Sequence, residues 1–236
     1  EYNDHTRTLY AGADSVSAGK FAFTFPVPLD INYSDEPGLI ILHAISHDKS
    51  IEAQGLFEDF LIGDTYIEEQ TDTVGPTIAA YSDGHNTGEI SITTTTPTIR
   101  ITLYDENGIN TTGNGLGHDI IAIIDGKEAL TYTLNSHYTQ AIGDYRSGTV
   151  EYTLPTLPAG KHTLTVRAFD TLNNMGEGHY SFEAVAGLQE EYDIFDTAGR
   201  QLQHTDDLTS LPKGIYIKRL RLTSPKGVVY TKKEKI

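Results

Sequence analysis

The chain has 236 residues, of which 38% are hydrophobic and 9% aromatic, so it can form one to three domains with buried cores. Its 17 basic and 33 acidic residues give a formal net charge of −16, which argues against a nucleic-acid partner because phosphate binding requires a basic surface. No apolar run approaches the roughly 20 residues of a membrane-spanning helix, so we expect a soluble chain or one peripheral to a membrane. The sequence contains no cysteine, which excludes thiol catalysis, disulfides and thiolate metal sites within it.

The N-terminal part of the chain contains β-type patterns. At Phe21–Phe25 phenylalanine alternates with alanine and threonine, which predicts a strand with one buried face. The apolar run Leu39–Leu42 predicts a strand buried on both faces, whereas Ser50–Phe60 leaves helix and strand open. Gly63–Gly75 is acidic and poor in apolar residues, as linkers are. We therefore expect a β-rich segment over residues 1–71, continuing from an upstream domain.

The central part of the chain predicts a β-sandwich. Apolar and polar residues alternate at Ile99–Leu103, Val150–Leu154 and Leu164–Ala168. The run Ile120–Ile124 predicts a strand buried on both faces, and the Asp125-Gly126 pair that follows favours a tight hairpin because both residues tolerate positive φ. Glycine and proline interrupt these segments about every eight to twelve residues, as in sandwiches.

These patterns define the expected fold class and domains. We predict an all-β chain with an immunoglobulin-like β-sandwich over residues 72–186, flanked by the N-terminal β-rich segment and by a small β module over residues 187–236. The last 25 residues carry eight basic residues and one acidic residue, a net charge of +7, so the rest of the chain carries −23. A module of about fifty residues is too small for a large core, so we expect it to lean on the sandwich or on a partner.

Oxygen-bearing side chains are concentrated in two loops of the predicted sandwich. The loop Asp105–Asn110 places three such residues before a glycine, and Asp72 and Asp170 could bring further oxygens to the same pole. Calcium takes six to eight oxygen ligands, so Asp72, Asp105, Asn107 and Asp170 are candidate ligands of a structural calcium ion. The alternative is that these residues only form turns, because Asp and Asn side chains bind the local backbone.

Two histidine patterns invite a chemical interpretation. His118-Asp119 could act as a hydrolase pair with Ser136 or Ser147, but the chain has no Gly-x-Ser-x-Gly pattern, so we expect a histidine that caps a loop. His43 and His47 have a spacing that binds zinc only on a helix, and the surrounding residues predict a strand.

The chain has fourteen tyrosines and eight phenylalanines, which could line a carbohydrate-binding surface. The alternative is that most of them are core aromatics, because most lie on faces that the patterns predict to be buried.

Several stretches of the sequence resemble a known family. They are Phe25–Ser34, Glu52–Gly63, Asp105–Asp125, Asp144–Asn174, Phe195–Leu202 and Leu211–Leu222. Together they resemble the non-catalytic C-terminal region of the PorU family, the gingipain-related sortases of the type IX secretion system. The last two stretches resemble the C-terminal signal domain of that system. Phe169 stands where the family has tryptophan, and Gly187–Ile194 lacks the Asn-Pro strand that opens the signal domain.

The resemblance implies a division of labour within a longer protein. In the family, an upstream caspase-like domain removes the C-terminal signal of cargo proteins through a cysteine nucleophile, and then attaches the cargo to lipopolysaccharide. Such a thioester route needs a thiolate, so we expect no catalysis in this chain. The implied role is structural support of that caspase-like domain and docking to the outer-membrane barrel protein PorV at the bacterial cell surface.

The basic residues of the C-terminal module are the candidate contacts for PorV. They are Lys213, Lys218, Arg219, Arg221, Lys232 and Lys233. The competing interpretation is a solvated strand end without a partner. A different function class also stays open, namely a calcium- or carbohydrate-binding adhesion module of a secreted surface protein.

Overall fold

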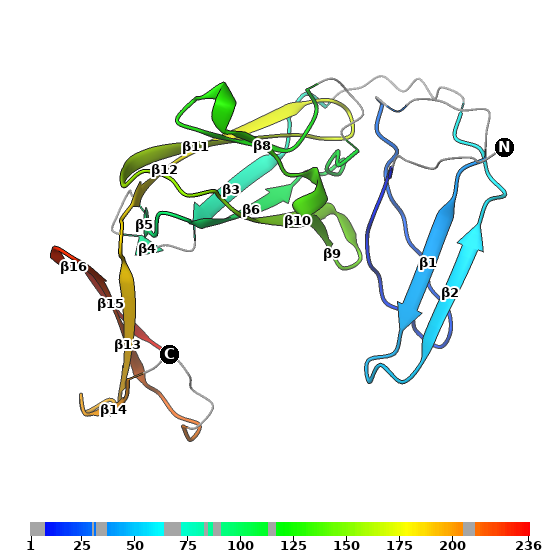
Figure 1. Ribbon diagram of the computed structural model, residues 1–236. Helices are drawn as coiled ribbons and strands as arrows, with labels where there is room; N and C mark the ends of the chain where they lie inside the picture. Colours follow the sequence, from blue (N-terminus) through cyan, green and yellow to red (C-terminus); the bar gives the residue numbers. More distant parts are fainter. Residues whose placement is uncertain are drawn as a thin grey trace. The chain divides into compact units, whose positions relative to one another are not determined.

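The computed structural model describes residues 8–29, 31, 37–63, 72–82, 85–86, 91–112, 117–204 and 211–236. In these parts of the chain the secondary structure is almost entirely β, with two short 3-10 helices (Figure 1). The predicted all-β fold class is therefore confirmed. No described helix is long and apolar enough to cross a membrane.

The chain divides into two compact units. The first comprises Glu1–Ala80, Arg100–Tyr152 and Leu164–Tyr180, and the second comprises Tyr81–Ile99, Thr153–Thr163 and Ser181–Ile236. The described strands belong to four sheets of two, four, six and four strands.

The two-stranded sheet is a hairpin of β1 (Ile40–Ile45) and β2 (Glu52–Phe57), which pair antiparallel. Asp48 holds the turn between them, because its carboxylate accepts hydrogen bonds from the hydroxyls of Ser46 (2.6 Å) and Ser50 (2.8 Å). These bonds lower the pKa of Asp48 to about 2. The open question over Ser50–Phe60 is thus resolved in favour of a strand.

Two burial predictions for the N-terminal segment are wrong. Leu39–Leu42 is not buried on both faces, because Ile41 is 71% exposed on β1. Phe21–Phe25 forms no assigned strand, and Phe21 is 52% exposed. The alternating phenylalanines stack on one another instead, with ring centroids 6.2 Å apart for Phe21 and Phe23 and 6.0 Å for Phe23 and Phe25. The phenylalanine rings therefore pack on one another and on Tyr10, whose ring centroid lies 4.5 Å from that of Phe25.

The sandwich is built from a four-stranded and a six-stranded sheet (Figure 1). The first has the order β3-β6-β10-β9, with β3 (Thr77–Ser82), β6 (Thr98–Tyr104), β9 (Tyr138–Ala141) and β10 (Asp144–Thr153). The second has the order β4-β5-β12-β11-β7-β8, with β4 (His85–Asn86), β5 (Ser91–Thr93), β7 (Ile121–Ile124), β8 (Thr131–Thr133), β11 (Gly160–Phe169) and β12 (Met175–Ala184). The 3-10 helices η1 (Glu128–Leu130) and η2 (Asn135–His137) flank β8.

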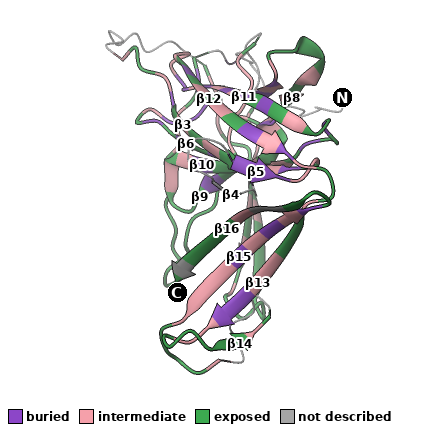
Figure 2. Ribbon diagram, turned by 90° about the vertical axis from the view of Figure 1, so that its left-hand side faces the viewer, coloured by how far each residue is buried: buried purple, intermediate pink, exposed green. Residues whose placement is uncertain are grey.

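Alternating burial along the strands follows the alternating sequence (Figure 2). On β6, Ile99, Ile101 and Leu103 are at most 2% exposed, whereas the residues between them face outward. On β11, Leu164–Ala168 shows the same alternation. The Asp125-Gly126 turn after β7 has φ of 54° and 64°, as its sequence predicts. Burial of these branched side chains is the main source of stability in such a fold.

The C-terminal sheet has the order β14-β13-β15-β16. Its strands are β13 (Gln189–Phe195), β14 (Gln201–Gln203), β15 (Ile217–Ser224) and β16 (Gly227–Lys235). Leu220 and Leu222 of β15 form a buried cluster with Ile92 of β5. Val185, Leu188, Tyr192 and Tyr230 pack against this cluster. The small sheet thus obtains part of its core from β5, as its size requires.

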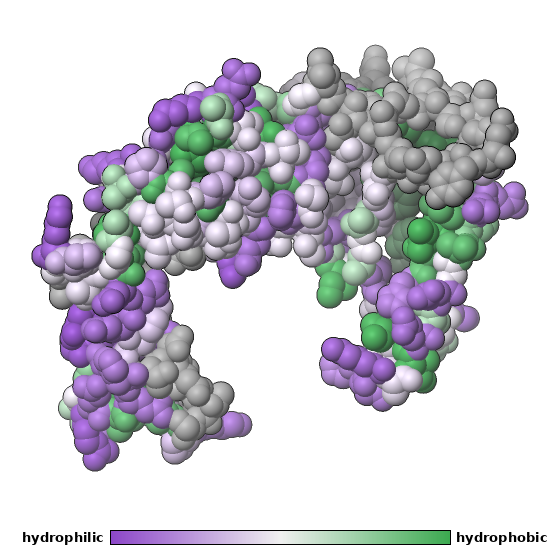
Figure 3. Space-filling view, viewed as in Figure 1, coloured by the Kyte–Doolittle hydropathy of each residue, from purple (hydrophilic) through white to green (hydrophobic). Residues whose placement is uncertain are grey.

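Apolar side chains are exposed mainly in the N-terminal segment. Eleven of the 18 exposed large hydrophobic residues lie between Val16 and Leu61, and Ile31 is the one buried hydrophobic residue among the described residues 8–63. On the hairpin, Ile41 and Leu56 are paired and are 71% and 70% exposed. Figure 3 shows this hydrophobic surface in green beside the polar tip of the hairpin.

Candidate functional site

Three aspartates from distant parts of the sequence meet at one place in the first unit. Asp72 precedes β3, Asp105 follows β6 and Asp170 follows β11, and each offers a carboxylate oxygen within 4.8 Å of the other two. Asp105 and Asp170 are buried, and Asp72 is half-buried. These are the three carboxylates predicted as calcium ligands, so the structure brings the predicted set together.

The Asp105 loop is fixed by backbone hydrogen bonds. The N–H of Asp105 donates to the carbonyl of Arg146 on β10 (2.9 Å), and the Asp105 carboxylate accepts from the N–H of Asn107 (2.8 Å). Gly108 then takes a φ of 93°, and a Cβ there would lie 2.8 Å from Pro26 Cγ. Only glycine fits this turn without strain. The loop conformation therefore fixes the direction of the Asp105 carboxylate.

The Asp170 loop is fixed in a similar way. The Asp170 carboxylate accepts hydrogen bonds from the N–H groups of Leu172 (2.9 Å) and Asn174 (2.7 Å), and from Asn174 Nδ2 (2.8 Å). Asn174 Nδ2 also reaches the carbonyl of Asp72 (3.3 Å). The fourth predicted ligand, Asn107, donates from Nδ2 to Asp72 Oδ2. Two asparagines thus connect the three aspartates, Asn174 through its side-chain amide and Asn107 through its side-chain amide and its backbone N–H. The part played by Asn174 was not predicted, although it lies in the loop that begins with Asp170.

The cluster concentrates the negative charge of three carboxylates in one place. None of the three carboxylates forms an ion pair with a residue in the described part of the chain. Burial raises the pKa of Asp105 to about 6, and repulsion from Asp170, Asp72 and Glu106 adds to this rise, whereas the hydrogen bond from Asn107 opposes it. A divalent cation would remove this repulsion. Three carboxylates with nearby amide and backbone carbonyl oxygens are donors that suit Ca²⁺.

The described hydrogen bonds do not join the predicted hydrolase pair to either predicted serine. The His118 ring lies against Phe169, with centroids 4.5 Å apart. The Ser147 hydroxyl donates to Asp144 Oδ2 (2.8 Å), and Ser136 lies in η2. No described hydrogen bond joins either serine to His118. Residues 113–116 of the neighbouring glycine-rich stretch lie outside the described residues.

The second histidine pattern lies on the N-terminal hairpin. His43 is on β1 and binds Glu52 Oε1 of β2 (2.7 Å), and His47 is in the turn. The helical spacing that zinc needs is therefore absent from these two residues.

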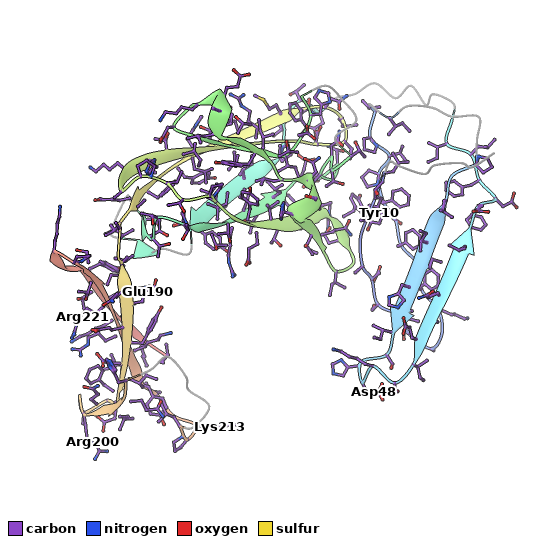
Figure 4. All side chains as sticks on the ribbon, viewed as in Figure 1. Tyr10, Asp48, Glu190, Arg200, Lys213 and Arg221 are labelled. Carbon is purple, nitrogen blue, oxygen red and sulfur yellow. The ribbon has the colours of Figure 1, made fainter. Side chains whose placement is uncertain are left out.

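At least three of the six candidate docking cations, namely Lys218, Arg219 and Arg221, are engaged within the C-terminal sheet. Arg219 binds Asp193 (Nε to Oδ2, 2.9 Å), and Arg221 Nη1 lies 3.2 Å from Glu191 Oε2. Lys218 Nζ lies over the Tyr192 ring, 4.6 Å from its centroid. Lys213 and Lys233 form no ion pair with any residue that the structure describes. Lys213 lies away from Arg221 along the sheet (Figure 4), so the candidates do not form one basic cluster.

Asp193 is an organising residue of this sheet that the sequence analysis did not single out. Its carboxylate is 4% exposed and accepts hydrogen bonds from Arg219, from His204 Nδ1 (2.6 Å) and from Gln201 Nε2 (2.9 Å). Burial opposes ionisation, but the bonds from His204 and Arg219 outweigh it and lower the pKa of Asp193. One sequence signal could have revealed Asp193. Acidic residues occupy alternate positions of β13, and arginines occupy alternate positions of β15.

Comparison with solved structures found a similar chain at 28% sequence identity. The chain is similar to dimeric latent PorU from Porphyromonas gingivalis, with 28% sequence identity over 89% of this chain and a TM-score of 0.48. The match spans 24% of the PorU chain. PorU belongs to the family that the sequence motifs resemble.

A second solved structure is far less similar. It is BcpA, the major pilin subunit of Bacillus cereus, with 14% identity over 84% of this chain and 74% of the pilin, and a TM-score of 0.19. No protein-family model and no curated protein matches the chain.

Proposed function

We propose that this chain is the non-catalytic C-terminal part of a type IX secretion surface sortase. In this proposal the sandwich and the N-terminal segment support an upstream caspase-like domain, and the C-terminal sheet docks to the outer-membrane barrel PorV at the cell surface. The parent protein would remove the C-terminal signals of cargo proteins and attach the cargo to lipopolysaccharide.

The proposal depends on one observation above all: sortase-like motifs run through most of a chain that has no cysteine. The motifs at Asp105–Asp125 and Asp144–Asn174 lie in the sandwich, and those at Phe195–Leu202 and Leu211–Leu222 lie in the C-terminal sheet. A cysteine-dependent transpeptidation therefore needs a nucleophile from outside this chain.

The exposed apolar surface of the N-terminal segment supports the bracing role. Single exposed hydrophobic residues are normal, but a two-stranded hairpin with apolar residues on both faces is only marginally stable alone in water. On this hairpin Ile41, Ile45 and Leu56 are 55–71% exposed on one face, and Phe57 is 48% exposed on the other. A neighbouring folded domain would cover these side chains and gain free energy from their burial.

Capture by purified PorV tests the docking role. The full chain and a variant that ends at residue 186 are incubated with immobilised, detergent-solubilised PorV, and the bound fraction is measured. We expect capture of the full chain alone. Because Ile92 loses its partners Leu220 and Leu222 in the shortened chain, circular dichroism and a thermal melt must show that its sandwich is folded. Equal capture of both chains would contradict the proposed role of the C-terminal sheet.

A second proposal concerns the three aspartates. We propose that Asp72, Asp105 and Asp170 bind a structural Ca²⁺ ion, because two buried carboxylates and one half-buried carboxylate converge there without a described counter-charge. Such an ion would fix the pole of the sandwich near Gly108. It would serve equally in a sortase support domain and in the alternative, an adhesion module.

A glycan array separates these two functions. The adhesion alternative requires carbohydrate binding, whereas the sortase proposal does not, so a chain that binds no glycan would remove the carbohydrate-binding form of the adhesion alternative.

A further inference from the structure

The outer edge of β16 is open in the part of the sheet that the structure describes. β16 is the last strand in the order β14-β13-β15-β16, and no described residue pairs with it on the side away from β15. An open edge presents unpaired N–H and C=O groups, which can pair with an added strand.

The register identifies which backbone groups face outward. Tyr216 and Ile236 exchange two N–H···O bonds of 3.0 Å, so they form a hydrogen-bonded pair of the antiparallel ladder. Such pairs alternate with pairs that exchange no bonds. The next pair, Ile217 with Lys235, is therefore of the second kind, and so are the pairs formed by Lys233 and Thr231. The N–H and C=O groups of Thr231, Lys233 and Lys235 consequently face the open edge.

The side chains of the same three residues share one face of the sheet. Residues directly opposite in an antiparallel pair lie on the same face, so Asp193, Arg219 and Lys233 form one row across the sheet. In this row Asp193 neutralises Arg219. Lys233 of the same row and Lys235 of the next row on this face are exposed and form no ion pair with any described residue. The edge therefore combines outward-facing backbone groups with two positive charges at alternate positions, and no described residue forms an ion pair with either of them.

The sheet itself shows which strand complements such an edge. On the other side of β15, strand β13 places Glu191 and Asp193 directly opposite Arg221 and Arg219. Both pairs form ion pairs, with Nη1–Oε2 of 3.2 Å for Arg221 and Glu191 and Nε–Oδ2 of 2.9 Å for Arg219 and Asp193. An acid-x-acid strand thus already pairs with a base-x-base strand within this sheet.

We propose that the outer edge of β16 binds an extended peptide segment with acidic residues at alternate positions. The peptide adds as a further strand, its backbone pairs with Thr231, Lys233 and Lys235, and its acids face the two lysines. Edge lysines normally prevent strand pairing, and here they repel the same edge of a second copy. A peptide with acidic residues at alternate positions is instead attracted to the two lysines, so the edge selects such peptides over neutral or basic ones. The inference depends on the sheet geometry and not on the sortase assignment.

Binding of synthetic peptides to the full chain tests the proposal. The probe is the capped, fluorescently labelled heptapeptide Thr-Val-Glu-Val-Glu-Val-Thr, and its anisotropy is measured during titration with protein. The matched control, Thr-Val-Val-Glu-Glu-Val-Thr, has the same composition but directs its glutamates to opposite faces. We expect the first peptide to bind more tightly. Its binding must also protect the amides of Lys233 and Lys235 from hydrogen exchange, because these are the outward-facing groups.

Charge reversal supplies the second arm of the test. We expect the double variant Lys233→Glu with Lys235→Glu to bind the first peptide about tenfold more weakly or worse, because two cross-strand charge pairs are reversed. The same variant should prefer a peptide in which lysines replace the two glutamates. Lys161→Glu with Lys226→Glu changes two exposed lysines away from this edge by the same net charge and should leave binding nearly unchanged. Equal affinity of the two glutamate peptides, unchanged binding by the edge variant, or no binding to the wild-type protein would each overturn the proposal.

Discussion

Replacing the buried Asp105 by asparagine is expected to change stability in opposite directions with and without calcium. Burial and neighbouring carboxylates raise the pKa of Asp105 from 3.8 to about 6. A carboxyl group whose pKa is higher in the folded than in the unfolded protein stabilises the fold at a pH below its unfolded-state pKa. That stabilisation is lost as the pH rises through its folded-state pKa. At about 1.4 kcal/mol per pKa unit, ionisation of Asp105 lowers the free energy of unfolding by at most about 3 kcal/mol at neutral pH.

Asparagine retains the acceptor for the N–H of Asn107 but carries no charge. In metal-free buffer near neutral pH we therefore expect Asp105→Asn to raise the free energy of unfolding by about 1–3 kcal/mol. The gain should shrink towards about pH 4, where Asp105 of the wild-type protein is protonated. With calcium the order reverses, because the ion stabilises the folded wild-type protein and the variant has lost a ligand.

Thermal unfolding measures both effects. Melting curves of both proteins are recorded from about pH 4 to about pH 8, with chelator and with about 5 mM calcium, above the affinity range of extracellular calcium modules. A change of 1 kcal/mol corresponds to about 2–4 °C for a chain of this size. Asp59→Asn, an exposed residue outside the cluster, controls for the change in net charge. Identical pH profiles and identical calcium responses of Asp105→Asn and the wild-type protein would refute the reasoning.

Three further substitutions test the packing around the candidate sites. Asp193→Ala should destabilise the C-terminal sheet by about 2–3 kcal/mol in urea unfolding, because it leaves the partly buried Arg219 unpaired. Glu191→Gln should cost less than about 1 kcal/mol, because its ion pair with Arg221 is more exposed to solvent. Gly108→Ala should lower the melting temperature more than Gly126→Ala does. Both glycines have positive φ, but only at Gly108 would the added Cβ also clash with a neighbour, so Gly108→Ala should cost about 1–3 kcal/mol. Equal losses in the two variants would contradict this. Ile92→Ala should speed amide exchange in β15 and cost about 2–4 kcal/mol, and unchanged exchange would show that the cluster does not anchor the sheet.

Local alternation predicted the strands of the sandwich because their side chains alternate between core and solvent. Ile99–Leu103 and Leu164–Ala168 follow this rule closely. The same pattern at Phe21–Phe25 predicted a strand that the structure does not form. Alternation places apolar side chains on one side of the chain, but it does not specify which part of the protein covers them. Ile41 shows the same limit, since an apolar run does not specify how many faces are buried.

The candidate sites show what residue types alone can and cannot establish. Asp72, Asp105 and Asp170 could be proposed together because loops at one pole of a sandwich lie near one another. Their separation of less than 4.8 Å depends on strand order and register, which the sequence did not provide. Register also decides that Arg219 faces Asp193, so a residue chosen from net charge as a docking contact serves an internal ion pair.

The pairing of β5 with β12 has a consequence for the kinetics of folding. These strands run parallel, with Ser91 opposite Phe182 and Thr93 opposite Ala184, so they bring together segments about ninety residues apart. Contacts of such high sequence separation slow folding, because a long loop must close before they form. A chain emerging from a ribosome or a translocation pore in the N-to-C direction cannot complete the six-stranded sheet until β12 has appeared. Chaperones and proteases would therefore meet an unfinished sheet for most of the time that the chain needs to emerge.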